Sequence, residues 1–281
     1  MADSVVCVPE LPEVESVRRQ LHPALVGRVV VAAWVDRDGP RTSPVEHAAG
    51  LEVLDVVRRG KYLLLPLGDV EDGAEAELVL HLGMTGRFRI ADGPQHPDLG
   101  HVRARFELDD GTWLLFDDVR RFGRVNLVEP GDHAGIPTLA ALGPEPLSDD
   151  FDADAFAAAL AATSAPVKAR LLDQRLVAGV GNIYADEALW LARIHPRSRR
   201  VGRARAHRLH AAVREVIAAA IEREGTTFRD YEMVNGQSGR NADFLVAYGR
   251  ADLPCQRCGT PMRRTVVAQR GTTYCPDCQR A

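Results

Sequence analysis

Hydrophobic positions in the first 130 residues recur in short runs separated by turns that contain glycine and aspartate. Runs of roughly four to eight residues rich in Val, Leu, Ile and Phe are typical of β-strands. Strands are therefore predicted over residues 28–35, 51–57, 61–67, 77–82, 86–90, 101–108, 112–117 and 124–128. Residues 13–25 have the period of a helix instead, with Val14, Val17, Leu21 and Leu25 on one face. These elements predict an antiparallel β-sandwich with a flanking helix.

The pattern changes after a segment rich in proline and glycine at residues 131–150. Apolar positions then predict helices over 152–162, 166–172, 183–192 and 206–224, with Gly225 as a C-cap residue. The cysteine-containing end of the chain predicts a β-hairpin finger. The fold class expected is α+β multidomain, with an N-terminal domain over 9–130, a linker over 131–150, a helical domain over 151–240 and a finger over 246–281.

Charge is distributed unevenly along this chain of 281 residues, whose formal net charge is −4. Residues 160–281 carry +9 and residues 1–159 carry −13. A basic half-chain favours a nucleic-acid partner, although a solvated helix face in an arginine-rich protein would give the same count. No apolar run approaches the ~18 residues of a membrane-spanning helix. Only Lys61 and Lys168 are lysines, which points to two positions that require an ammonium group.

The four cysteines near the C-terminus form two C-x2-C pairs separated by sixteen residues. Two such pairs suit tetrahedral zinc, and the spacing is that of a zinc ribbon. Two disulfides or a redox pair are the alternatives, and both fit this chain less well. The predicted site is structural, because four thiolates leave no open coordination position. It holds one Zn²⁺ on Cys255, Cys258, Cys275 and Cys278.

A glycine-rich turn at residues 178–182 joins two of the predicted helices. Gly179 and Gly181 let backbone N–H groups approach a phosphate at the start of the next helix, where Asn182 adds an amide donor. An ordinary helix cap would have the same short sequence. Beside a zinc ribbon and a basic half-chain, phosphate binding is the better interpretation.

Several motifs together resemble the formamidopyrimidine-DNA glycosylase family, and the resemblance covers residues 9–281. The glycine-rich turn resembles that family's helix–two-turn–helix element. The other motifs follow in the family's order: Pro-Glu-Leu-Pro-Glu-Val-Glu at 9–15, Leu-Gly-Met-Thr-Gly at 82–86, Arg-Arg-Phe-Gly at 120–123, Tyr-Gly-Arg at 248–250 and the terminal zinc finger. The expected fold is then a β-sandwich, a helix–two-turn–helix bundle and a zinc-ribbon hairpin.

The resemblance implies a bifunctional enzyme of base excision repair. Such an enzyme excises oxidised purines, 8-oxoguanine and formamidopyrimidines, and then cleaves the strand at the abasic site by β,δ-elimination. The implied catalytic residues are Pro9 as the amine nucleophile, Glu10 as the acid/base group, Lys61 as a phosphate contact and proton donor, and Arg270 in δ-elimination. The implied partner is double-stranded DNA with damaged bases or abasic sites, bound by a monomer in the bacterial cytoplasm, at the nucleoid.

The same resemblance implies six residues that contact DNA. Phe122 would wedge between bases, Met84 would fill the gap, and Arg120 would bond to the orphaned partner base. Lys168, Asn182 and Tyr248 match phosphate contacts. Residues 229–241 match a loop that covers the extruded base.

Residues 1–8 create a chemical difficulty, because the nitrogen of Pro9 is a tertiary amide as long as they precede it. Val8 occupies the place of the family's initiator Met, and a GTG codon is read as Met when it starts translation. We therefore expect that residues 1–8 lie upstream of the working N-terminus. The alternatives are a catalytically blocked homologue that binds damaged DNA, and an endonuclease VIII-like glycosylase for oxidised pyrimidines.

Overall fold

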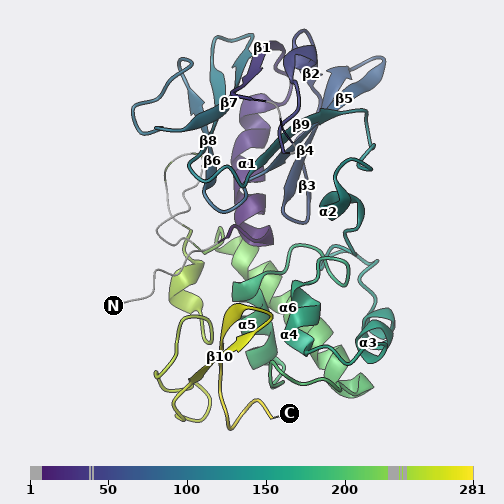
Figure 1. The fold of residues 1–281 in the computed structure, drawn as a ribbon, viewed down its shortest axis with the longest axis vertical. Coiled ribbons are helices and arrows are strands. Elements are labelled where there is room, and N and C mark those ends of the chain that lie inside the picture. The colour runs from purple at the N-terminus through teal and green to yellow at the C-terminus, as the bar shows by residue number, and fades with distance from the viewer. Residues whose placement is uncertain are drawn as a thin grey trace. The chain divides into compact units, whose positions relative to one another are not determined.

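The computed structural model describes residues 8–280 apart from 38, 40, 227–233, 235, 237 and 238. Its residues divide into two compact units, which are treated separately below. The first unit takes the described residues of Met1–Ala140 and Glu224–Gly239, and the second those of Ala141–Arg223 and Arg240–Ala281. Figure 1 labels most of their helices and strands.

Two antiparallel sheets form most of the first unit (Figure 1). One sheet has the order β1-β7-β8-β6, from strands β1 (Val30–Val35), β6 (Gly86–Ala91), β7 (Val102–Leu108) and β8 (Trp113–Asp118). The other has the order β2-β4-β5-β9 with β3 also on β4, from strands β2 (Glu52–Val53), β3 (Val57–Arg59), β4 (Tyr62–Asp69), β5 (Gly73–His81) and β9 (Arg124–Val128). A short 3-10 helix, η1 (Glu46–Ala48), lies between β1 and β2 in the chain.

The core of the first unit lies between these sheets. Leu63, Leu65 and Leu80 of one sheet and Phe88 and Phe116 of the other are each at most 2% exposed. The rings of Phe88 and Phe116 pack 4.9 Å apart between centroids. Strand β4 is buried along most of its length, which explains its continuous apolar run in the sequence. The predicted β-sandwich is therefore present.

Helix α1 (Leu11–Leu25) packs against β3 and β4, and its predicted apolar face is the buried one. Val14, Val17, Leu21 and Leu25 are each at most 1% exposed. The helix begins two residues earlier than its apolar period indicates, because Pro12 is accepted in the first turn and Glu10 precedes it as N-cap. Both predicted catalytic residues at 9 and 10 therefore stand directly before the helix.

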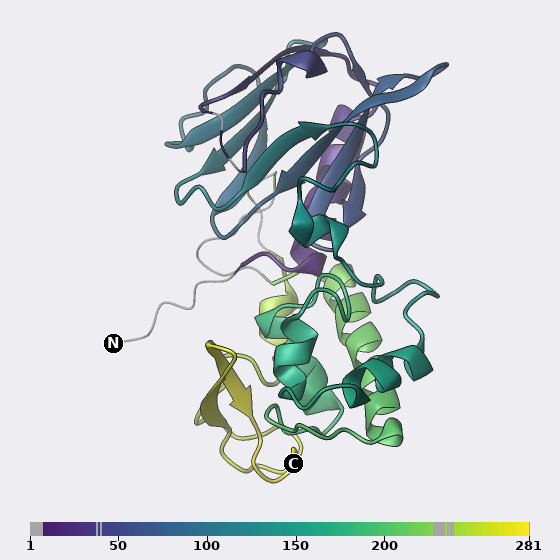
Figure 2. The same ribbon diagram turned by 45° about the vertical axis from the view of Figure 1, so that its right-hand side comes forward.

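The second unit is mainly helical (Figure 2). Its longer helices are α3 (Ala153–Ala161), α4 (Val167–Leu172), α5 (Asn182–Leu191) and α6 (Arg203–Glu222), and α6 packs against both α3 and α5. A 3-10 helix, η2 (Asn241–Phe244), follows later in the chain. The finger is the antiparallel hairpin β10 (Arg263–Val267) and β11 (Arg270–Tyr274), and β11 lies against α5.

The described fold departs from the sequence prediction at three places. The predicted strand over 51–57 is two strands, β2 and β3, and the predicted linker contains a short helix, α2 (Pro137–Ala140). The described residues of 224–239 group with the first unit rather than with the helical domain predicted over 151–240. Buried Glu13 explains part of this, since its Oε1 accepts the backbone N–H of Thr226 at 2.6 Å. Periodicity carries no information about such a long-range bond.

Two predictions concern residues outside this description. Residues 1–7 and most of the loop predicted over 229–241 lie outside the described residues. Within the described chain, no helix is both long and apolar enough to cross a membrane.

The close contact between two loops of the first unit yields a stability prediction. Gly83 has a φ of +65°, and a Cβ there would lie 2.4 Å from both Phe122 C and Gly123 N. Gly83→Ala should lower the free energy of unfolding by roughly 2–4 kcal/mol. Gly111→Ala is the matched control, since Gly111 has a φ of +82° but nothing within 4 Å of its Cβ. Equal losses for the two variants in chemical denaturation would contradict the predicted steric clash.

Candidate DNA-processing site and zinc centre

The start of α1 holds Pro9 and Glu10 in a buried setting. Pro9 is buried, and Glu10 is 3% exposed. Glu13, which is fully buried, accepts the backbone N–H of Glu10 at Oε2 with a distance of 2.9 Å. The main chain beside the predicted nucleophile is therefore fixed by a carboxylate one helical turn further on.

One end of the five-stranded sheet gathers positive charge. Lys61 lies in the two-residue turn between β3 and β4, His81 ends β5, and Arg124 starts β9 opposite His81. Burial lowers the pKa of His81, and together with the charges of Lys61, Arg124 and Arg41 it brings that pKa to about 3. The first unit thus carries a local cationic cluster although residues 1–159 are acidic in total.

His81 is a neutral donor in this cluster. Its Nδ1 accepts the backbone N–H of Gly83 at 2.9 Å, which places the proton on Nε2. The ring also packs against that of Tyr62, at 4.6 Å between centroids. A neutral imidazole that donates from Nε2 suits an anionic acceptor such as phosphate. The sequence reasoning did not name His81, although its place directly before the Leu-Gly-Met-Thr-Gly motif was a usable signal.

Two loops extend from the same end of that sheet, and they carry Met84 and residues 120–122. Buried Asp118 joins them. Its Oδ1 accepts the Thr85 hydroxyl at 2.6 Å, and its Oδ2 accepts the Gly123 N–H at 2.7 Å. The two loops that carry the predicted void-filling residues are therefore joined through one side chain, that of Asp118.

Phe122 is exposed over 40% of its surface, which is unusual for a phenylalanine. The guanidinium carbons of Arg120 and Arg41 lie 4.7 Å and 5.4 Å from the centre of its ring. Arg41 also donates to the carbonyl of Arg121 at 3.2 Å. An exposed aromatic ring with two cations near it is suited to insertion between bases beside a phosphate backbone.

In the second unit, the glycine-rich turn is held by one side-chain amide. Gln174 Oε1 accepts the N–H of Gly179 at 2.9 Å, and its Nε2 donates to the carbonyl of Val180 at 2.8 Å. Gly179 has a φ of +79°, a conformation that favours glycine. The turn delivers Asn182 to the first position of α5. Asn182 Nδ2 donates to the carbonyl of Gly271 in the finger at 3.1 Å.

Lys168 occupies a different environment from the one expected. Its side chain has no exposed surface, and its Nζ bonds to Asp186 Oδ1 at 2.6 Å and Thr272 Oγ1 at 2.8 Å. A direct phosphate contact does not fit this burial. Burial raises the pKa of Asp186 to about 7, and the Lys168 ammonium opposes that rise. The need for an ammonium at this position stays a prediction, and its buried surroundings were not foreseen from the sequence.

Glu187 holds the loop that carries Tyr248. Its carboxylate accepts the backbone N–H groups of Val246, Ala247 and Tyr248 at 2.8–3.0 Å. Burial raises the pKa of Glu187, while these three bonds favour its charged form. Tyr248 itself is partly exposed, and Arg270 is exposed at the start of β11. Both remain accessible to a ligand.

The four predicted zinc ligands lie together. The Sγ atoms of Cys255, Cys258, Cys275 and Cys278 are all within 4.8 Å of one another. Tetrahedral zinc with Zn–S bonds of about 2.3 Å needs sulfurs roughly 3.8 Å apart, so the set fits one ion. The outer contacts also fit, since Trp190 Nε1 points at Cys255 Sγ at 3.4 Å and the Arg257 guanidinium covers the Trp190 ring at 3.6 Å. The centre is one structural zinc site.

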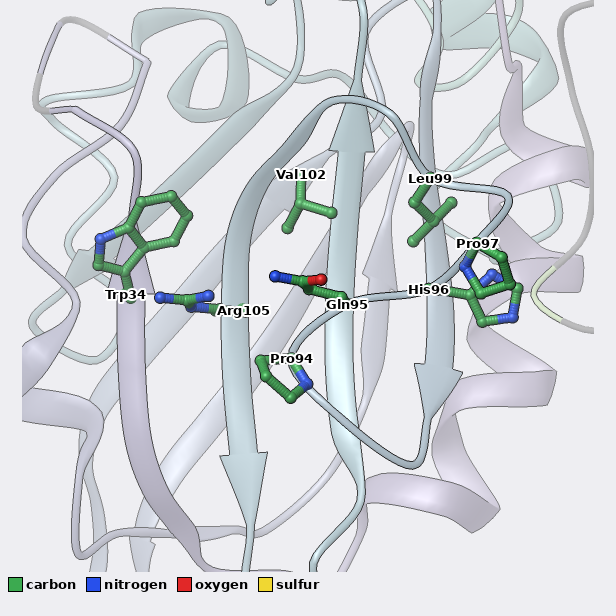
Figure 3. Close-up of a pocket in the computed structure, with 8 residues that line it drawn as sticks. All are labelled: Trp34, Pro94, Gln95, His96, Pro97, Leu99, Val102 and Arg105. Carbon is green, nitrogen blue, oxygen red and sulfur yellow. The ribbon is translucent and has the colours of Figure 1, made fainter.

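A surface groove of about 480 Å³ lies apart from these residues (Figure 3). Trp34 and Arg105 lie side by side in it, with the guanidinium carbon 4.5 Å from the centre of the Trp34 ring. The other lining residues are Pro94, Gln95, His96, Pro97, Leu99 and Val102. None of the predicted site residues lines this groove.

Together these features define a class of protein: a β-sandwich and a helical unit with a zinc finger, bearing exposed cations and an exposed aromatic ring. Comparison with known families agrees. Residues 8–125 match the formamidopyrimidine-DNA glycosylase N-terminal domain, residues 142–232 its H2TH domain, and residues 252–281 the zinc finger found in FPG and IleRS.

Full-length relatives are similar throughout. The formamidopyrimidine-DNA glycosylase of Deinococcus radiodurans is 49% identical over 282 residues, which cover 97% of each chain. The crystal structure of the MutM (Fpg) protein from Thermus thermophilus is 47% identical, with a TM-score of 0.87 over 96% of this chain and 98% of that one. A Lactococcus lactis Fpg mutant in complex with a Fapy-dG containing DNA is 35% identical, with a TM-score of 0.87 over 97% and 100%. This chain belongs to the formamidopyrimidine-DNA glycosylase family.

The perturbed pKa of His81 predicts a pH dependence of stability. The folded-state pKa of about 3 lies below the usual value of 6.5. Between these two pH values, the unfolded chain therefore binds a proton on His81 that the folded chain does not. The stability contributed by neutral His81 is complete above pH 6.5 and is lost as the pH falls toward 3. His81→Asn keeps an acceptor for the Gly83 N–H at Oδ1 but has no group that titrates in this range. Between pH 7 and pH 4 its free energy of unfolding should therefore fall by on the order of 3 kcal/mol less than that of the parent protein. Denaturation curves of equal pH dependence for both proteins would contradict this.

Metal removal should act locally. Chelation should disorder the cysteine hairpin and leave the β-sandwich folded, because the ligand set lies wholly within the second unit. In a Trp34→Phe/Trp113→Phe background, Trp190 is the remaining tryptophan, and its fluorescence should change on chelation as its bond to Cys255 is lost. Metal analysis should give one zinc per chain. A value near zero for the folded protein would refute the site.

Proposed function

We propose that this protein is a bifunctional DNA glycosylase and abasic-site lyase of base excision repair that acts on oxidised purines in duplex DNA. The observation that carries the proposal is the pairing of Pro9 with buried Glu10 at the start of α1, in a chain related to these glycosylases over 97% of its length. The substrate is DNA with 8-oxoguanine, formamidopyrimidines or abasic sites. The site of action is chromosomal DNA at the bacterial nucleoid.

The chemistry requires Pro9 to be a secondary amine. Its nitrogen attacks C1′ of the damaged nucleotide, the C1′–N bond to the base breaks, and opening of the sugar ring gives an iminium ion. This cation makes a proton on C2′ acidic. When that proton is lost, the electron pair left at C2′ forms a double bond to C3′, and the bond from C3′ to the 3′ phosphate oxygen breaks. A second elimination breaks the bond to the 5′ phosphate oxygen. Water then releases Pro9 from the sugar remnant.

Other residues supply protons and charge. Glu10 protonates the sugar ring oxygen as it opens, because its buried carboxyl lies next to Pro9 in the chain. Lys61 and its cationic neighbours hold a phosphate beside the nucleophile. Arg270 assists the second elimination. The zinc ion takes no part in these steps and stabilises the finger that carries Arg270.

The damaged base must leave the helix before attack. Phe122 inserts between bases, Met84 fills the vacated space, and Arg120 bonds to the orphaned partner base. Asn182 and Tyr248 bind phosphates. The exposure of Phe122 and the bonds of Asp118 that join the two loops support these roles.

The decisive experiment compares two forms of the chain with borohydride and an abasic duplex. Borohydride reduces the iminium ion to a stable amine and so traps the DNA adduct. The form that begins at Pro9 should be trapped efficiently, and the form that keeps residues 1–8 should not, since a tertiary amide forms no iminium. Intact mass measurement verifies both N-termini.

Three outcomes discriminate among the functions. Efficient trapping of the long form would overturn the assignment of Pro9. Trapping of neither form would favour the catalytically blocked DNA-binding homologue. Excision of thymine glycol in preference to 8-oxoguanine by the short form would favour an endonuclease VIII-like enzyme.

A further inference from the structure

The turn of the zinc finger is fixed by a buried ion pair that the proposed chemistry does not use. Lys168 on α4 and Asp186 on α5 are 0% and 1% exposed, and their charged groups lie 2.6 Å apart. Such a pair is costly to desolvate and is weak evidence for stability alone. The contacts of the pair with β11 indicate what it positions.

Lys168 bonds to the finger at two points. Besides Asp186, its Nζ donates to Thr272 Oγ1 at 2.8 Å and to the carbonyl of Gly271 at 3.3 Å. The Thr272 hydroxyl in turn donates to the carbonyl of Arg270 at 3.0 Å. A continuous chain of hydrogen bonds therefore runs from the ammonium to the main chain of Arg270.

The helices hold the same strand by two further bonds. Asp186 Oδ2 accepts the N–H of Thr273 at 2.9 Å, and Asn182 Nδ2 donates to the Gly271 carbonyl at 3.1 Å. Residues 271–273 pair with β10 within the hairpin, and side chains of α4 and α5 attach them to the helices. Their attachment sets the height and rotation of β11 against α5.

The main chain of Arg270 has little freedom of its own relative to that strand. The hairpin turns through Ala268 and Gln269, with φ values of 49° and 59°, and Arg270 pairs with Val267 directly after the turn. A two-residue turn of this kind is tight and fixes the first residue of the next strand. The main-chain position of Arg270, from which its exposed side chain extends, therefore follows from that of residues 271–273.

We propose that Lys168 and Asp186 are positioning residues for Arg270, acting through Thr272 and the start of β11. The inference rests on the role in the second elimination proposed for Arg270 above. It gives the buried lysine a function in the reaction without contact with DNA. The two-unit architecture makes the attachment local, because all of these residues belong to the second unit.

The test is a double-mutant cycle on a duplex with a ready-made abasic site, using the form that begins at Pro9. The measured quantity is the rate at which the β-elimination product becomes the δ-elimination product. Arg270→Ala and Lys168→Met should each slow this step by about tenfold or more. In the Arg270→Ala background, Lys168→Met should slow it no further, because its effect passes through Arg270.

Two more variants guard against a simple folding defect. Thr272→Val keeps the shape of the side chain and removes the hydroxyl that links Lys168 to Arg270, so it should reproduce part of the Lys168→Met effect. Val167→Ala is the matched control, since Val167 is buried on α4 but its side chain has no place in the bond chain. It should destabilise the protein without changing the ratio of the two elimination rates.

Hydrogen exchange gives a readout independent of catalysis. Lys168→Met should speed exchange of the Thr273 amide at least tenfold, with zinc content unchanged.

If Arg270→Ala did not slow the second elimination, the role proposed for Arg270 would be wrong. If Arg270→Ala slows the step while Lys168→Met leaves it unchanged, or adds fully to it, the positioning role alone fails. Unchanged exchange at Thr273 would overturn it as well.

Discussion

Buried carboxylates must be satisfied by donors, and this single requirement fixes the segments that carry the proposed site. Glu13 is bonded to the N–H groups of Glu10 and Thr226. Asp118 holds the N–H of Gly123, and Glu187 holds three consecutive N–H groups up to Tyr248. Each acid is nearly inaccessible to solvent, so each bond replaces water that the carboxylate has lost.

The same requirement explains how an acidic chain presents basic groups. Several acids lie inside, where main-chain N–H groups stabilise them or a buried lysine pairs with them, so their carboxylates are not on the surface that a ligand meets. Arg120 and Arg270, by contrast, are exposed. The formal net charge of −4 is therefore a poor guide to DNA binding, because it does not show where the exposed positive charges lie. The cationic cluster around Lys61 lies within the more acidic half of the sequence.

The two units use different means to make a rigid platform. In the first, two sheets share an apolar core, and the loops that carry Met84 and Phe122 leave the sheet from adjacent strands. In the second, a hairpin too small to have its own core is held by zinc at one end and by Lys168 and Asp186 near the other. Loss of either attachment should leave the finger incompletely fixed.

The sequence determined a large part of this description by local rules. Alternation and apolar runs located most strands, the period of Val14 to Leu25 located α1, and cysteine spacing located the zinc centre. Each of these signals depends on residues close together in the chain or on a ligand count. Motif order added the family, which the full-length comparisons agree with.

Only the tertiary structure decided which charged groups are buried and what they bond. The sequence could not reveal that Lys168 is enclosed, because its partners at 186 and 272 are distant in the chain. It also left His81 unnamed, since the pKa of that residue depends on the strand pairing that places Arg124 opposite it and on the nearby Lys61. Burial and electrostatics depend on three-dimensional distances, and those distances arise from packing between elements that a one-dimensional pattern does not encode.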